Sequence, residues 1–151
     1  MEITLKVKQS EILDEVARTT SYTGAKKDDD ANAYERISTV DEDKEELMRF
    51  WYETRAVVAQ TFIRLLKTEG MAEDNDTYEL TLKVSTSFDT SLIDGMQNGL
   101  FSYFVQSITG KWYKYTNRGE VERYEADGKK TLEEVREKAY YKASPQRPTY
   151  N

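Results

Sequence analysis

The longest amphipathic pattern in the chain lies between Asp41 and Glu69. Its apolar residues recur at intervals of three and four, which is the spacing of a helix with one buried face. They are Leu47, Phe50, Trp51, Val57, Val58, Phe62, Leu65 and Leu66. Thr39 and Glu42 have the spacing of a capping box at the helix start, and Gly70 suits a left-handed cap at its end. We therefore predict one long central helix over residues 41–69.

Two other segments alternate apolar and polar residues, as strands with one buried face do. They are Ile3–Lys8 and Thr77–Val84. An unpaired strand leaves its backbone groups unsatisfied, so we expect these two to pair in one small sheet. A two-stranded ribbon is marginally stable alone. It must therefore pack on the helices, or pair with a strand of a neighbouring molecule.

Helical spacing also predicts three further helices. Their ranges are Glu11 to about Thr20, Thr90 to about Lys114, and about Gly119 to Lys142. Ser10 and Asp89 precede the first two and are suitable N-cap residues. Gly95 and Gly99 lie four residues apart, so a neighbouring helix could approach that face closely. Gly110 could interrupt the same helix near its end.

The predicted fold class is mainly α with a minor β part (α+β). We expect a bundle of about four helices around the long central helix, with a small antiparallel β-ribbon. A chain of 151 residues corresponds to about one domain, to which we assign residues 1–143. Residues 144–151 contain two prolines and no apolar period, so we predict an extended C-terminal tail.

The composition favours a protein with contact surfaces. Eleven Tyr, five Phe and two Trp are present, and Tyr and Trp are enriched at interfaces, although such rings can also simply cover helix flanks. The net charge of −6 argues against a nucleic-acid-binding protein, which usually has a basic footprint. The N-terminal segment alternates, so we predict no signal peptide. No segment approaches the roughly 20 apolar residues that cross a membrane.

The sequence lacks the residues of most catalytic sites. It contains neither His nor Cys, which excludes thiol nucleophiles, Cys/His zinc sites and the commonest general base. The glycine-rich phosphate-binding motifs and the G-x-S-x-G motif are also absent. We therefore expect no cofactor and no enzymatic activity. A carboxylate-only metal site or a glycosidase-like carboxylate pair is the enzymatic alternative.

Two segments are candidate interaction sites, together with the strand edges. The loop Ala25–Ala33 contains Lys26, Lys27, Asp28, Asp29 and Asp30, and the tail contains Pro145, Arg147, Pro148 and Tyr150. A solvated charged loop is the simpler interpretation of the first segment. Its three adjacent Asp could hold a cation, but they lack the alternating spacing of an EF-hand. We therefore assign no calcium site to this loop.

Basic and aromatic residues near the C-terminus have two interpretations. The basic residues there are Lys129, Lys130, Arg136, Lys138, Lys142 and Arg147, and on a helix they could form a basic stripe. Glutamates interleave with them, so pairing along the helix is the favoured interpretation. The segment 112–115 (Trp-Tyr-Lys-Tyr) mixes rings with a cation, as single-strand binders do. Packing at a helix end is favoured there.

A group of short segments resembles a known class of protein. The segments are Asp41-Glu-Asp with Leu47 and Phe50, the strand Tyr78–Val84, Phe88-Asp89-Thr90-Ser91-Leu92, Tyr103-Phe104-Val105, Lys111-Trp112-Tyr113-Lys114, Thr116-Asn117, Tyr124, Leu132–Arg136, and Arg147-Pro148. The resemblance they carry extends over about two thirds of the chain. In this order they resemble small structural proteins of Bacteroidetes phages and prophages.

The resemblance implies a virion structural protein of the head–tail connector (adaptor) type. Such a protein forms a homo-oligomeric ring between portal and tail proteins, and DNA passes through it without specific recognition. The resemblance implies no cofactor and no catalytic residue. It places the protein in the virion after assembly in the bacterial cytoplasm. Two strands suit a tail-completion protein equally well, and a small non-enzymatic binding or regulatory module is the alternative outside virion structure.

Overall fold

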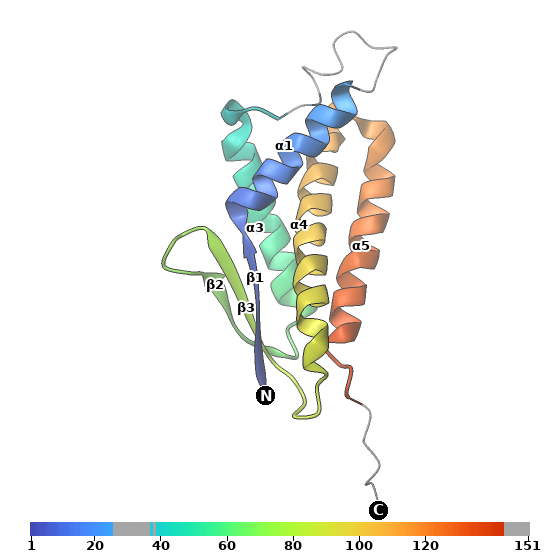
Figure 1. The fold of residues 1–151 in the computed structure, drawn as a ribbon. Coiled ribbons are helices and arrows are strands. Elements are labelled where there is room, and N and C mark those ends of the chain that lie inside the picture. The colour runs from blue at the N-terminus through green and yellow to red at the C-terminus, as the bar shows by residue number, and fades with distance from the viewer. Residues whose placement is uncertain (26–36, 38, 144–151) are drawn as a thin grey trace, which may run out of the picture.

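The structure, a computed structural model, describes residues 1–25, 37 and 39–143. In these residues four helices and one three-stranded sheet form the fold (Figure 1). The elements are β1 (Glu2–Lys8), α1 (Gln9–Ala25), α3 (Lys44–Thr61), β2 (Leu66–Met71), β3 (Thr77–Lys83), α4 (Ile93–Thr116) and α5 (Val121–Lys138). Short 3-10 turns precede three of the helices, at Asp41–Asp43, Thr90–Leu92 and Arg118–Glu120. The predicted class, mainly α with a small antiparallel sheet, is confirmed.

The central helix is α4 and not the predicted helix over residues 41–69. In Figure 1, α4 runs through the middle of the molecule, and α1, α3, α5 and β1 all pack against it. Its buried residues are Met96, Leu100, Tyr103, Phe104, Val105, Ile108, Thr109, Gly110 and Tyr113. A helix that buries residues around most of its circumference belongs in the interior. In contrast, α3 buries one narrow stripe, as a peripheral helix does.

The predicted long helix ends early, and its last residues form a strand. After Thr61 the chain turns, and Leu65 accepts a backbone hydrogen bond from Lys83 of β3 at 2.7 Å. Leu65 and Leu66 still pack against the core, but from the turn and from β2. Their helical spacing is therefore coincidental. Gly70 lies inside β2 with φ +158° and does not cap a helix.

The sheet has the order β1-β3-β2 with antiparallel pairs throughout. The predicted pairing of the first and third strands is confirmed, with Leu5 opposite Leu80 and Val7 opposite Tyr78. The apolar residues of both strands face the helices and are buried. On the other face Thr4 and Thr81 share a hydrogen bond at 2.9 Å.

Helix boundaries follow the predicted signals in part. Asp89 does cap the turn before α4, since its carboxylate accepts the Ser91 N–H at 3.0 Å. Ser10 lies inside α1 and does not precede it, and its N–H and hydroxyl both bind Asp76. The predicted capping box of Thr39 and Glu42 is wrong by one position. The corresponding hydrogen bond joins the next two residues, since the Val40 N–H donates to the Asp43 carboxylate.

Three other boundary predictions need correction. The first helix continues past its predicted end to Ala25, and α4 continues through Gly110 without interruption. The last helix ends at Lys138 and not at Lys142.

The glycine spacing on α4 marks a close helix contact, as predicted. A Cβ atom placed on Gly99 would lie only 2.6 Å from Cγ2 of Val135 in α5. At Gly95 the nearest atom is the flexible Lys138 ammonium, at 3.6 Å. The missing side chain of Gly99 therefore sets the distance between the two helices.

Two aromatic clusters organise the core. Trp51, Tyr78 and Phe104 join α3, β3 and α4, with ring centroids 4.7–6.1 Å apart. At the other end of the bundle, Ile37 is fully buried against Tyr113, and its carbonyl accepts the Trp112 indole N–H at 2.6 Å. The favoured packing interpretation of the 112–115 segment is therefore confirmed for Trp112 and Tyr113.

Candidate functional site

The interaction residues predicted from sequence lie outside the described residues. This holds for Lys26, Lys27, Asp28, Asp29 and Asp30 of the loop, and for Pro145, Arg147, Pro148 and Tyr150 of the tail. The chain is described as far as Ala143, whose N–H donates to the Ser87 carbonyl at 2.7 Å. Of the predicted interaction elements, the strand edges can be examined directly.

Both edges of the sheet carry features that oppose further strand pairing. At the β1 edge, the Lys6 N–H already donates to Gln97 of α4 at 2.9 Å. At the β2 edge, the ladder is irregular between Leu66 and Thr68, which disrupts a regular template. Glu69 of β2 also pairs with Arg55 of α3 at 3.3 Å. The edges are therefore poor sites for adding a strand.

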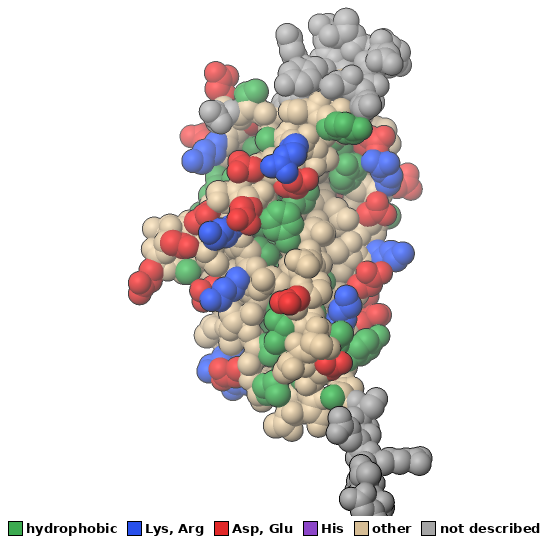
Figure 2. Space-filling model, viewed as in Figure 1, with side chains coloured by type: hydrophobic (Ala, Val, Ile, Leu, Met, Phe, Trp, Pro, Cys, Tyr) green, Lys and Arg blue, Asp and Glu red, His purple; other side chains and the backbone are tan. Residues whose placement is uncertain are grey.

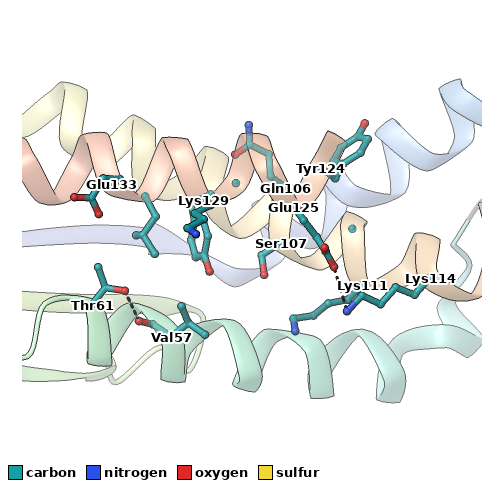
Figure 3. A pocket seen from close by; sticks show the side chains of 14 residues that line it. Val57, Thr61, Gln106, Ser107, Lys111, Lys114, Tyr124, Glu125, Lys129 and Glu133 are labelled. Atoms are coloured by element: carbon teal, nitrogen blue, oxygen red, sulfur yellow. Dashed lines mark hydrogen bonds and ion pairs between the residues drawn. The ribbon is translucent and has the colours of Figure 1, made fainter. Parts of the chain in front are cut away.

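A groove between α3 and α5 is the better candidate. It lies over the C-terminal half of α4, has a volume of about 340 Å³, and is lined by side chains of all three helices. Figure 3 shows α3 along one side of it and α5 along the other. The lining residues are Val57, Thr61, Tyr103, Gln106, Ser107, Gly110, Lys111, Lys114, Tyr124, Glu125, Gly128, Lys129, Leu132 and Glu133.

Small residues on α4 and α5 leave room for the groove. Gly110 and Gly128 present no side chain, and Ser107 presents a short one. A Cβ atom on Gly128 would have its nearest neighbours at 3.7–3.8 Å, which is ordinary van der Waals contact. The side facing α5 is formed by Val57 and Thr61 of α3. Val57, predicted as part of the buried stripe, is 45% exposed here.

Hydroxyl groups on the floor of the groove have partners, whereas one buried acceptor beside it has none. Ser107 and Thr54 share a hydrogen bond at 2.8 Å, and the Thr54 hydroxyl donates to the Phe50 carbonyl. Burial raises the pKa of Tyr103, and a hydrogen bond with Ser107 opposes that rise in part. In contrast, the Gln106 Oε1 atom is buried and has no hydrogen-bond partner. A buried polar atom of this kind costs free energy until a donor reaches it.

The rim of the groove is formed by charged residues of both signs. Lys111 pairs with Glu53 at 3.1 Å, and Lys114 pairs with Glu125 at 3.2 Å. Glu133 pairs with Arg136 at 2.9 Å. The pair of Glu133 and Arg136 is of the kind that the ion-pairing interpretation expects for the C-terminal helix. Because most of these side chains are well exposed, each pair contributes little stability and can exchange partners.

The hydroxyl groups of Ser107 and Thr61 in the groove have hydrogen-bond partners within the protein. Ser107 bonds with Thr54 and Tyr103, and Thr61 donates to the Val57 carbonyl at 2.8 Å. In the described part of the chain, no three acidic residues are grouped to hold a metal ion. The resolved carboxyl shifts there are downward, as for Asp74, whose pKa is lowered to about 2 by hydrogen bonds from Thr77 and Asp76. Such a carboxyl is a poor proton donor.

Exposed hydrophobic side chains continue from the groove over α3. Tyr52 and Val57 are exposed on α3, and Ile63 follows just after its end. Tyr115, also exposed, stacks on Phe50 with ring centroids 6.3 Å apart.

On the face shown in Figure 2, acidic and basic side chains are interspersed without a large patch of one sign. The described helices include none with the length and apolarity needed to span a membrane.

Comparison with protein-family models, with curated proteins and with solved structures finds no match for this chain. The groove and its surroundings are therefore interpreted from their own geometry. Sequence patterns did not predict the groove, since it depends on how far apart α3 and α5 lie across α4. The only local signal was the small residues Gly110 and Gly128 within otherwise well-patterned helices.

Proposed function

We propose that the chain is a structural assembly protein, a ring subunit of the head–tail connector type that docks between portal and tail proteins of a phage particle. The observation that carries this proposal is the open groove across α3, α4 and α5, which has a volume of about 340 Å³. Apolar and aromatic side chains line it, and exchangeable ion pairs surround it. A subunit that assembles with copies of itself needs such a surface.

Two further features support an assembly role. The exposed rings of Tyr52 and Tyr115 lie on the outside of the bundle, and tyrosine is a residue that interfaces favour. The resemblance of the sequence to small phage structural proteins is the reason for proposing a head–tail connector and not another assembly. In a ring of this kind the virion is the final location and the bacterial cytoplasm is the site of assembly.

The charge of the chain suits passage of DNA without specific recognition. Phosphate contacts from Lys and Arg drive non-specific binding, and the net charge here is −6. Several described basic side chains are already paired with carboxylates, including Lys6 with Glu79 and Lys67 with Glu2. We expect no shift of random-sequence duplex DNA in a gel at about 50 mM salt. A tight shift under that condition would contradict this part of the proposal.

The native mass and the particle composition test the proposal. Light scattering on the purified chain should give a closed oligomer, and the chain should be present at a fixed copy number in purified particles. A monomer that occurs in no particle would refute the connector role. That result would favour the alternative of a small non-enzymatic binding or regulatory module, in which the same groove binds one partner. A position at the tail end of the particle would indicate a tail-completion protein.

A further inference from the structure

The groove between α3 and α5 leaves apolar surface that an occupant could cover. On its α3 side Val57 is 45% exposed, and across the groove the partly buried Tyr124 belongs to the α5 lining. An extended peptide can cover such surface with its side chains.

The C-terminal segment of the same sequence has the matching chemistry. Pro145-Gln146-Arg147-Pro148 has the P-x-x-P spacing that favours polyproline II geometry. Peptides of this kind bind grooves lined by aromatic rings, and Tyr103 and Tyr124 line this one. Arg147 carries a positive charge, while Glu125 and Glu133 lie two helical turns apart along the α5 side.

We propose that the groove binds the Pro145–Tyr150 segment of a second copy of the chain. In this arrangement the prolines cover Val57 and Tyr124. The Arg147 guanidinium replaces an exposed partner of Glu125 or Glu133. The inference rests on the proposed function, because it names the contact through which neighbouring ring subunits would join.

The position of Ala143 favours a neighbouring copy over the chain's own groove. Lys142 and Ala143 are bonded to Phe88 and Ser87, before the start of α4. The groove begins on α4 near Tyr103, about 15 Å further along the helix from Ile93. Residues 144–151 span at most about 28 Å when fully extended, so about half of that length would be used in reaching the chain's own groove. A neighbour can present its groove directly.

Disulfide trapping between two single-cysteine chains tests the proposal, because the natural sequence has no Cys. Full-length Val57→Cys and Thr149→Cys proteins are mixed under mild oxidation and run on a non-reducing gel. We expect a mixed dimer as the main crosslinked product. The matched control is Ile63→Cys, an exposed aliphatic position outside the groove, which should give little mixed dimer with Thr149→Cys.

Three results would overturn the proposal. The first is equal crosslinking of Val57→Cys and Ile63→Cys. The second is no mixed dimer at all although circular dichroism shows that the variants are folded. The third is a Val57→Cys/Thr149→Cys chain that closes an internal disulfide while the mixture gives no dimer, since the segment would then occupy its own groove.

A charge substitution supplies a second readout. Val57→Arg places a cation on the α3 side of the groove, and we expect self-association to weaken about tenfold or more, since a buried unpaired charge is costly. Ile63→Arg should leave self-association unchanged. If particle composition supports the connector role but Val57→Arg assembles normally, the groove contact is wrong and the proposed function stands. If the chain occurs in no particle while the crosslink forms, the function is wrong and the contact stands.

Discussion

The closest contact between α4 and α5 gives the sharpest stability prediction. Gly99→Ala would place a methyl carbon 2.6 Å from Val135 Cγ2, whereas carbon atoms normally approach to about 3.5–4.0 Å. Val135 is buried, and a valine in a helix has essentially one side-chain rotamer. The valine cannot rotate away, so the two helices must move apart by about 1 Å at this point.

The net effect combines two opposing terms. Overpacking a core costs about 1–3 kcal/mol, while replacing a glycine inside a helix by alanine contributes up to about 1 kcal/mol. We therefore expect Gly99→Ala to lower the free energy of unfolding by about 1–2 kcal/mol. Gly128→Ala is the matched control on α5, because its Cβ atom would have neighbours at 3.7–3.8 Å. This control should raise the free energy of unfolding by about 0.5–1 kcal/mol.

Urea unfolding followed by tryptophan fluorescence measures both effects. Trp51 and Trp112 lie in different clusters and report on the whole bundle. The double variant Gly99→Ala/Val135→Ala removes the clashing methyl group, so its loss should be smaller than the sum of the two single losses. A coupling of at least about 0.5 kcal/mol is expected for side chains in contact. Stabilisation by Gly99→Ala, or strict additivity in the double variant, would refute the packing argument.

Three other predictions follow from the described residues. Ile37→Ala should cost about 2–5 kcal/mol in urea unfolding because Ile37 is fully buried, whereas Val40→Ala, at a site 58% exposed, should change stability by less than about 0.5 kcal/mol. Burial raises the pKa of Tyr113 to about 12, so the folded state keeps a proton that the unfolded state loses near pH 10. Stability should therefore fall as the pH rises from 10 towards 12, and less steeply in Tyr113→Phe; parallel pH profiles of the two proteins would contradict this. The pKa of Asp74 is lowered to about 2 by hydrogen bonds from Thr77 and a neighbouring backbone N–H, so Asp74 stabilises the fold above its usual pKa and loses this effect as the pH falls through 2. Thermal unfolding should show that Asp74→Ala is destabilising at pH 7 and that the difference shrinks towards pH 2; a constant difference would refute the assignment.

The parts of the fold that follow local patterns could be predicted from sequence. Strict alternation in β1 and β3 leaves one possible buried face for each strand, and antiparallel pairing then follows. The Gly95 and Gly99 spacing correctly indicated a close helix contact, because only a missing side chain permits it. The Asp89 cap could be predicted because its hydrogen bond is local: the acceptor and the donor lie within three residues of each other.

The parts that depend on neighbours could not be predicted. Leu66–Met71 has no strand alternation, and it forms β2 because β3 offers it an open edge. Leu65 and Leu66 extended the helical spacing of α3 although they reach the core from a turn and a strand. The groove is a third case. The apolar stripe of α3 includes Val57, but the stripe does not show that α5 leaves this side chain uncovered.

The pairing of β1 with β3 has a consequence for how the chain is made. Leu5 lies opposite Leu80, so about 75 residues must be synthesised before the first strand can find its partner. At roughly 5–20 residues per second, that interval lasts on the order of 4–15 s. During this time the apolar face of Ile3, Leu5 and Val7 has no sheet to join, and contacts so distant in sequence also form slowly. The nascent chain is therefore most exposed to aggregation along this first strand, and we expect chaperones that act on emerging chains to bind it there.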